Sequence, residues 1–282
     1  MPTVLSIQSW VACGNVGNNA ALFSLQRLGC DTWSLNTVAF SNHTGYGAWR
    51  GRAWEPAAIA EVIAGIGERG QFGRCEVVLS GYLGEPALGD AALAAAAAAK
   101  AANRGALYCC DPVIGDDHSG IFVRPGIAEF LRDRALPAAD IVTPNRFELA
   151  LLAEREVASL PDALAAAARL RARGPRLVLV TSLAGGSESE IAMLAAGEAG
   201  AWRVATPRLP ILANGAGDLT AALFLGFFLR RGDVAAALGA TAAAVYAVIE
   251  ATLRAGEQEL QIVAAQAELE APPRQFAPER VG

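Results

Sequence analysis

Residues 214–220 read Asn214-Gly215-Ala216-Gly217-Asp218-Leu219-Thr220 and lead directly into an apolar run, Ala221–Leu229. Glycine adopts left-handed conformations without a steric penalty, so Gly215 and Gly217 predict a tight turn ahead of a buried helix. The N–H groups and the dipole at such a helix start attract anions such as phosphate. Asp218 adds a carboxylate that can accept a proton. The stretch predicts an anion-binding turn beside a base, and an ordinary helix N-terminus with an acidic first turn is the alternative.

The composition is that of a globular protein. Of 282 residues, 53% are hydrophobic and 18% are charged,. This length fits one large α/β domain, so we expect a single domain over residues 1–282, with a loosely held tail at Pro272–Gly282. The formal net charge is −5 and no basic cluster stands out, which argues against nucleic acid as a partner. An anionic ligand therefore needs a local site.

The cysteines and the N-terminus favour a cytoplasmic location. Five cysteines and two histidines provide no CxxC pair and no spacing typical of a zinc site, so reduced thiols are expected. The N-terminus lacks the charged and apolar regions of a secretion signal. No uncharged apolar run of convincing hydropathy reaches membrane-spanning length. We therefore expect a cytoplasmic protein that does not contact membranes.

Short β-branched runs alternate with longer Ala- and Leu-rich segments, which predicts a mainly parallel sheet with helices on both faces. Near the end, the pattern changes to a β-hairpin, two long helices and a short helix over 257–266. The expected strands are Val4–Gln8, Thr32–Thr37, Val77–Ser80, Ala106–Asp111, Ile141–Thr143, Leu177–Thr181 and the hairpin strands Glu190–Leu194 and Ala201–Thr206. The expected helices are Asn18–Leu28, Pro56–Arg69, Pro86–Asn103, Gly126–Arg134, Arg146–Ala153, Leu160–Arg173, Gly217–Arg230 and Val234–Leu253.

Small, polar and acidic residues follow the predicted strands. In open α/β sheets, ligands bind beyond the carboxyl ends of the strands, so these residues are expected to share one rim. The segment Gly14-Asn15-Val16-Gly17-Asn18 lacks the third glycine of a dinucleotide fingerprint and is interpreted as a tight turn into a helix,. The rim residues are Ser9, His43, Thr44, Gly45, Tyr82, Asp111, Thr143, Asn145 and Glu148.

Six segments in this order resemble the ordered motifs of pyridoxal kinases, members of the ribokinase-like superfamily. They are Ile7-Gln8-Ser9, Phe40-Ser41-Asn42-His43-Thr44-Gly45-Tyr46, Ser80-Gly81-Tyr82-Leu83-Gly84, Cys110-Asp111-Pro112-Val113, Thr143-Pro144-Asn145-Arg146-Phe147-Glu148 and Gly215-Ala216-Gly217-Asp218. The resemblance implies a ribokinase-like three-layer α/β/α sandwich with a mainly parallel central sheet, usually as a homodimer. It also implies transfer of the γ-phosphoryl group of ATP to the 5′-hydroxymethyl group of pyridoxal.

The resemblance implies that the reaction centre lies at the glycine turn. Asp218 becomes the catalytic base, and the N–H groups of Gly215, Ala216 and Gly217 stabilise the transferring phosphoryl group as an oxyanion hole does. We expect a low pKa for Asp218 because it lies at a helix start.

Asp111 and Glu148 carry over as the carboxylates on the Mg²⁺ and phosphate side, since Mg²⁺ prefers oxygen ligands and keeps several waters. Asn145 and Glu148 match the N-x-x-E element of the superfamily. The same pair also fits a capping box at a helix start, and the two roles are compatible. Dependence on a monovalent cation is left open.

Substrate contacts carry over to residues that follow the first three predicted strands. Ser9, Thr44 and Gly45 correspond to positions that contact pyridoxal, while Tyr82 can stack on the pyridine ring or seal the pocket. His43 either supports these residues or contacts the substrate itself. For Thr206, Pro207, Arg208 and Leu209, the alternative is that the chain simply leaves a strand there without contacting a nucleotide. The nucleotide-binding residues implied are Asp111, Thr143, Glu148, Thr181, Thr206, Pro207, Arg208 and Leu209.

Two positions depart from the family pattern. Thr181 stands where pyridoxal kinases often have Lys, so a phosphate-side charge is missing unless Arg208 or another cation replaces it. Trp10 stands where the family often has His, which leaves the preference among B6 vitamers open. The alternatives are a hydroxymethylpyrimidine kinase of the same fold and a non-catalytic binder of B6 vitamers. The segment around His43 argues against the first, and the intact Asp218 turn argues against the second.

Overall fold

The computed structural model describes all residues, 1–282. The strands are β1 (Thr3–Val11), β2 (Asp31–Phe40), β3 (Gly51–Ala53), β4 (Val77–Ser80), β5 (Leu107–Cys110), β6 (Gly115–Asp116), β7 (Gly120–Ile121), β8 (Ile141–Val142), β9 (Leu177–Ala184), β10 (Glu190–Gly197), β11 (Gly200–Pro207) and β12 (Glu279–Arg280). The helices are α1 (Asn18–Arg27), α2 (Pro56–Glu68), α3 (Pro86–Ala102), α4 (Ile127–Phe130), α5 (Leu136–Ala138), α6 (Arg146–Ala153), α7 (Leu160–Arg171), α8 (Ala216–Arg231) and α9 (Val234–Ala255), with 3-10 helices η1 (Thr44–Tyr46) and η2 (Gln71–Arg74) and a π-helical turn, η3 (Leu131–Ala135).

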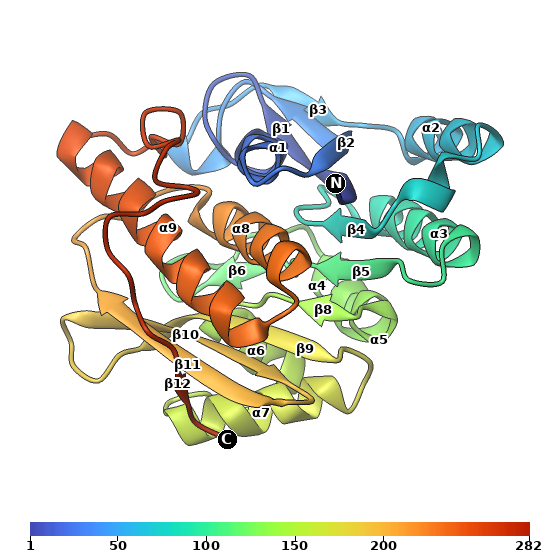
Figure 1. The fold of residues 1–282 in the computed structure, drawn as a ribbon. Helices are drawn as coiled ribbons and strands as arrows, with labels where there is room; N and C mark the ends of the chain where they lie inside the picture. Colours follow the sequence, from blue (N-terminus) through green and yellow to red (C-terminus); the bar gives the residue numbers. More distant parts are fainter.

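A ten-stranded sheet in the order β12-β11-β10-β9-β8-β5-β4-β1-β2-β3 forms the centre of the fold (Figure 1). Along this sheet, from β9 through β8, β5, β4 and β1 to β2, each strand is parallel to the next. An antiparallel strand, β3, closes one edge, and the antiparallel strands β10, β11 and β12 extend the other. The prediction of a mainly parallel sheet is confirmed. Parallel neighbours need long crossover connections, which the helices between them supply.

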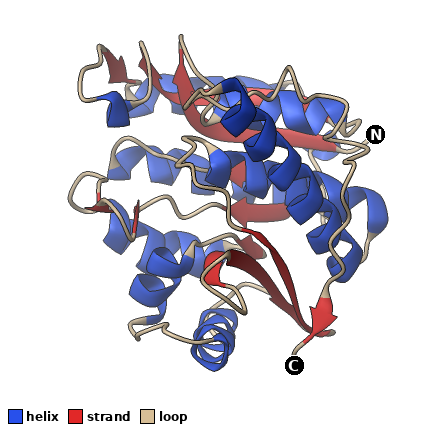
Figure 2. Ribbon diagram, turned by 90° about the vertical axis from the view of Figure 1, so that its left-hand side faces the viewer, coloured by secondary structure: helices blue, strands red, loops and turns tan.

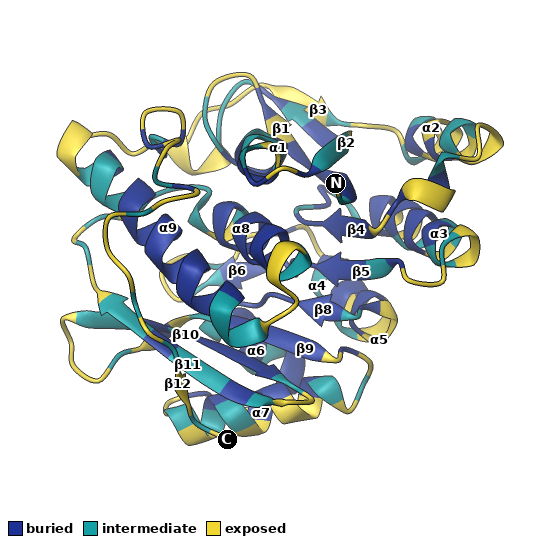
Figure 3. Cartoon of the chain, viewed as in Figure 1, coloured by how far each residue is buried: buried dark blue, intermediate teal, exposed yellow.

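Helices cover both faces of the sheet, so there are two hydrophobic cores (Figures 1 and 2). One core packs α1, α8 and α9 against Val77 and Leu79 of β4. The other packs α2, α3, α6 and α7 against Val78 of the same strand. This division follows from the alternation of side chains along a strand. Figure 3 shows that the middle parts of α8 and α9 are buried, as expected for segments that are apolar on nearly all sides,.

Helix α9 passes the length and composition test for a membrane-spanning helix, with a hydropathy of 1.7 over its most apolar window. The sequence-based expectation concerned uncharged runs, and Glu250 interrupts this helix, so the finding does not contradict it. Moreover, 67% of that window is buried inside the fold. The helix contacts α8, β10 and β11. Its apolar sequence is therefore explained by packing within the protein core.

The C-terminal part of the chain differs from its sequence-based prediction. No helix forms over 257–266, because Glu259 makes a parallel bridge with Asn214 and turns follow over 262–270. The tail is not loose either. It runs beside α9 and ends as β12, where Arg280 pairs with Trp202 (Figure 1). Phe276 packs edge-on against Tyr246 of α9, with ring centroids 5.3 Å apart. Apolar contacts therefore hold a Pro- and charge-rich segment in place.

Phe276→Ala is expected to lower the free energy of unfolding by about 2 kcal/mol, because the ring is half-buried and its removal uncovers α9,. Urea unfolding followed by circular dichroism measures the loss. Gln275→Ala is the control, since this neighbouring side chain is exposed and should change stability by less than about 0.5 kcal/mol,. Equal stability of both variants would show that the tail is not docked in solution.

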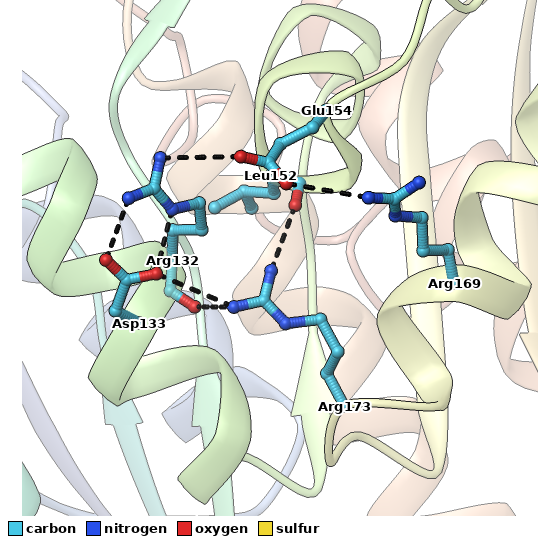
Figure 4. Close-up of polar contacts among 6 residues, drawn as sticks. All are labelled: Arg132, Asp133, Leu152, Glu154, Arg169 and Arg173. Carbon is cyan, nitrogen blue, oxygen red and sulfur yellow. Dashed lines mark hydrogen bonds and ion pairs between the residues drawn. The ribbon is translucent and has the colours of Figure 1, made fainter.

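An ion-pair network joins η3 to α6 and α7 on the outer side of the second core (Figure 4). Arg173 donates to the carbonyl oxygen of Arg132 at 2.7 Å and to that of Leu152 at 3.3 Å. Arg132 pairs with Asp133 at 2.8 Å and with Glu154 at 3.8 Å. The partners are partly exposed to solvent, so each pair contributes little alone,. Arg173 thus links the π-helical turn, through Arg132 O, to α6, through Leu152 O. The sequence predicted this turn as part of one continuous helix.

Candidate active site

The carboxyl ends of the parallel strands lie at one edge of the sheet, as the sequence predicted. Asp111 follows β5, Thr143 follows β8 and Thr181 lies within β9. Because β10 and β11 each reverse direction, β11 also ends at this edge, at Pro207. The connection from β11 then leads directly to Gly215 at the start of α8. The predicted nucleotide-side residues and the glycine turn thus occupy one rim.

The glycine turn packs against the turn between β1 and α1. Gly215 has φ 85°, a left-handed conformation that glycine adopts readily,. A methyl group on it would overlap the carbonyl oxygen of Asn15. Gly17 has φ 53°, and a methyl group there would overlap Ser9. Gly215 therefore allows the start of α8 to approach the turn at Asn15, and Gly17 allows that turn to approach Ser9 of β1.

Several N–H groups at the start of α8 are free to bind an anion. Those of Gly215, Gly217 and Asp218 have no acceptor within the protein. The N–H group of Ala216 donates to the carbonyl oxygen of Ala213 at a long 3.4 Å. Of the three predicted donors, Ala216 is thus partly occupied, while Asp218 offers an additional N–H group. This is the electropositive end of a sixteen-residue helix,.

Asp218 is held in place by the turn between β1 and α1. Its Oδ2 accepts a hydrogen bond from the N–H group of Gly17 at 2.8 Å. Burial of the carboxyl raises the pKa of Asp218 to about 6, against the opposing effect of that hydrogen bond. The expectation of a low pKa is therefore wrong, because desolvation outweighs the favourable helix start. A carboxyl group with this pKa is ionised at neutral pH and is a better proton acceptor than an exposed aspartate.

Asp111 and Glu148 are buried beside each other. The hydroxyl of Thr143 donates to Asp111 Oδ1 at 2.8 Å. Glu148 accepts hydrogen bonds from the N–H groups of Ile114 and Asn145, both at 2.9 Å, and completes a capping box with Asn145. Burial raises the pKa of Glu148 to about 7 despite these donors. The pKa of Asp111 is well above its usual range because of burial and of the nearby charges of Glu148 and Asp218.

These carboxylates suit a divalent cation that keeps most of its own water. No three His, Cys, Asp or Glu side chains gather closely enough to hold a metal ion by themselves. Both oxygens of Glu148 already accept N–H groups, while Oδ2 of Asp111 has no hydrogen-bond partner in the protein. Burial is the main cause of the raised pKa values of Asp111, Glu148 and Asp218, and a bound cation would favour their ionised forms,. Mg²⁺ is typically bound through one or two carboxylates and waters, so the residues fit it.

The acceptor side of the rim is formed by η1 and the end of β4. Thr44 and Gly45 lie in η1, which His43 caps by accepting the N–H group of Gly45 on Nδ1 at 3.2 Å. Burial lowers the pKa of His43. Tyr82 is half-buried against a small cluster that includes Val38. Its pKa is raised by burial, so its hydroxyl stays protonated. His43 thus supports the loop that carries Thr44.

The other residues predicted to bind the nucleotide are spread over several strands. The N–H group of Thr181 donates to Pro144 O at 3.0 Å, which places Thr181 beside the capping box. Thr206 and Pro207 lie two strands further along the sheet, and Leu209 follows them. Arg208 donates to a backbone carbonyl at 3.2 Å and makes no ion pair. Its positive charge is thus uncompensated.

Sequence reasoning missed two parts of this rim. Gly17 was interpreted only as a turn residue, although it binds Asp218. Glu259 was assigned to a helix, yet it contacts Asn15 and Tyr46. The one sequence signal for Gly17 was that it is the second glycine, after Gly14, in the turn that follows a strand. No local pattern marked Glu259.

The sheet has free N–H groups at a helix start, an adjacent carboxylate and two more buried carboxyl groups at its rim. This fold and rim are those of a phosphotransferase of the ribokinase-like class. Residues 84–263 match a family model described as phosphomethylpyrimidine kinase. Pyridoxal kinase PdxY of Rubrobacter xylanophilus is 57% identical over 281 residues, which cover 99% of this chain and 97% of the relative. PdxY of Deinococcus radiodurans is 51% identical over 286 residues, covering 99% and 96%. The chain belongs to the pyridoxal kinase family.

Solved structures agree with this assignment. Pyridoxal kinase from Leishmania donovani in complex with ADP and pyridoxine superposes with a TM-score of 0.93 at 28% identity, covering 99% of both chains. The same enzyme in complex with ADP and pyridoxamine gives a TM-score of 0.93 over the full length of both chains. The ribokinase-like prediction for the fold is thus confirmed.

Proposed function

We propose that this chain is a pyridoxal kinase that transfers the γ-phosphoryl group of ATP to the 5′-hydroxymethyl group of pyridoxal, giving pyridoxal 5′-phosphate and ADP. One observation carries the proposal. The Asp218 carboxylate and unoccupied N–H groups share the first turn of α8, and Gly17, in the turn between β1 and α1, holds that carboxylate. High identity to pyridoxal kinases over nearly the whole chain supports the choice of substrate.

In this mechanism, the Asp218 carboxylate accepts the proton of the 5′-hydroxyl while the hydroxyl oxygen forms a bond to the γ-phosphorus. The bond from the γ-phosphorus to the leaving ADP oxygen breaks. The N–H groups of Gly215, Gly217 and Asp218, with a lesser part for Ala216, stabilise the charge on the transferring group. Positioning and charge stabilisation account for most of the catalysis in phosphoryl transfer.

The remaining residues divide into two groups around this centre. Ser9, His43, Thr44, Gly45 and Tyr82 contact or enclose the vitamer. Asp111 would hold Mg²⁺ with Glu148 acting through water, and the metal supplies neutralising charge to the phosphates. The uncompensated charge of Arg208 supports it as the cation that replaces the family Lys at position 181. The proposed nucleotide-binding residues are Asp111, Thr143, Glu148, Thr181, Thr206, Pro207, Arg208 and Leu209.

We also propose a cytoplasmic homodimer. Trp49 and Trp54, with 40% and 48% of their surface exposed, flank the edge strand β3. An exposed sheet edge with large aromatic neighbours favours association with another chain. Light scattering coupled to gel filtration measures the mass, and a mass of one chain at micromolar concentration would contradict the dimer.

Purified protein incubated with MgATP and pyridoxal, pyridoxine, pyridoxamine or hydroxymethylpyrimidine tests the activity. We expect a phosphorylated product from pyridoxal, detected by chromatography and mass. Exclusive phosphorylation of hydroxymethylpyrimidine would assign the chain to the other kinase of this fold. Binding of vitamers without any phosphorylation would leave only the non-catalytic alternative.

The pH dependence of kcat/KM for pyridoxal is expected to show an acidic limb near pH 6. Below this pH, Asp218 is protonated and cannot accept the hydroxyl proton, so kcat/KM falls as pH decreases; above it, the value levels off,. Initial rates across this range of pH measure the limb. Glu148→Gln is the control, because the pKa of Glu148, about 7, is close to that of Asp218. A limb that disappears in this variant would assign it to Glu148.

A further inference from the structure

The segment that follows α9 places one carboxylate beside the glycine turn. A parallel backbone bridge joins Glu259 to Asn214, the residue before Gly215. The next residues anchor the segment, because Leu260 and Ile262 are 0% and 1% exposed. Glu259 is therefore fixed to the core while its side chain reaches towards the active-site loops.

One oxygen of Glu259 holds the turn between β1 and α1. Its Oε2 accepts the N–H group of Asn15 at 2.9 Å, and the Asn15 side chain donates to Leu260 O at 2.7 Å. The Cα of Gly14 is so close that a methyl group there would lie 2.7 Å from Oε2. The carbonyl oxygen of Asn15 is the atom against which Gly215 packs. A shift of Asn15 would thus displace the start of α8.

The other oxygen of Glu259 holds the loop that carries the acceptor residues. Its Oε1 accepts a hydrogen bond from the hydroxyl of Tyr46 at 2.6 Å. Tyr46 ends η1 directly after Thr44 and Gly45, and 40% of its surface is exposed. Its ring meets that of His43 edge-on, with centroids 6.4 Å apart. A single solvent-accessible bond of this kind opens readily.

We propose that Glu259 is a positioning residue for phosphoryl transfer, with one oxygen setting the turn behind the anion-binding N–H groups and the other latching the acceptor loop. This inference rests on the proposed kinase activity. Glu259 touches no reacting atom. It couples the two halves of the site: when the latch is closed, Thr44 and Gly45 are held beside Asn214 and the glycine turn. Opening of the Tyr46 bond lets the vitamer enter and the product leave.

Tyr46→Phe isolates the latch, because it removes only the hydroxyl. We expect KM for pyridoxal to rise about 5-fold with kcat within about 2-fold, since an open loop weakens vitamer binding and leaves the turn intact. Glu259→Ala removes both contacts, so kcat should also fall by about 10-fold. The double variant should raise KM no further than Glu259→Ala does, because both changes break the same bond.

Glu259→Gln and Glu257→Gln separate geometry from charge. The side-chain amide introduced by Glu259→Gln can accept from Asn15 and donate to the Tyr46 hydroxyl, so this variant should keep KM and kcat within about 2-fold of wild type. Glu257→Gln removes an exposed carboxylate two residues away that makes no hydrogen bond or ion pair, and should behave as wild type.

Hydrogen exchange gives a readout that does not depend on activity. Amides of residues 42–50 should exchange faster in Tyr46→Phe and Glu259→Ala than in wild type or Glu257→Gln. Wild-type kinetics and exchange in both latch variants, or equal slowing of all variants together with a lower Tm, would overturn the proposal. A wild-type protein without phosphorylation would instead refute the kinase function, and the exchange result would still decide whether the latch exists.

Discussion

Asp218→Asn is expected to lower kcat for pyridoxal phosphorylation by about 10²–10⁴-fold while leaving the affinity for ATP nearly unchanged. Asn cannot accept the hydroxyl proton. It does retain an oxygen that can accept the N–H group of Gly17, the contact that holds Asp218 in the wild type. The loss should therefore be chemical and not structural. Single-turnover rates measure the chemical step, and calorimetric titration with ATP measures binding.

Asp90→Asn is the matched control for this substitution. Asp90 lies on α3, where it forms a surface ion pair with Arg134 and has 53% of its side chain exposed. Loss of this carboxylate changes the net charge equally and should leave kcat unchanged. Near-wild-type turnover by Asp218→Asn would remove Asp218 as the base and assign proton transfer to another group or to solvent.

Gly215→Ala should reduce kcat/KM by about 10²-fold and also destabilise the protein. The residue has φ 85°, and the added methyl group would overlap the carbonyl oxygen of Asn15. The start of α8 must then move away from β1, which misplaces both Asp218 and the free N–H groups. Displacements of about 1 Å at a reacting centre have effects of this size. Steady-state kinetics and thermal unfolding measure the two losses.

Gly232→Ala provides the control at the opposite end of the same helix. Gly232 also has a positive φ, 66°, but no atom lies within 4 Å of an added methyl group. Backbone strain alone should cost about 1 kcal/mol of stability there and leave kcat/KM unchanged. A similar loss of activity in both variants would show that general strain, and not the contact with Asn15, explains the effect at Gly215.

Much of the fold was predictable from local pattern. The bounds of β4 and α6 are those predicted from sequence, and those of α3 and α9 differ by one or two residues. The misses occur where tertiary contacts override local preference. The end of the tail forms β12 because it pairs with β11, a contact that local sequence does not reveal. The segment around Glu259 forms a bridge instead of a helix because Leu260 and Ile262 are buried.

The candidate site was predictable as a set of residues but not as an electrostatic arrangement. Placement after strands correctly located Asp111, Thr143 and Glu148 at one rim, because parallel strands end at the same edge. The pKa of Asp218 was predicted in the wrong direction. A helix start favours a charged carboxylate, yet the depth of burial depends on every segment that covers the site, and local sequence does not reveal this.

The sequence by itself determined the class of fold, the glycine turn and the residue types at the rim, since these depend on neighbours within a few positions. Only the tertiary structure decided which distant segments complete the turn. Asp218 is bound by Gly17, 201 residues earlier, and Glu259 binds Asn15 across 244 residues. Such contacts depend on how strands and helices pack in three dimensions. Local periodicity carries no record of them.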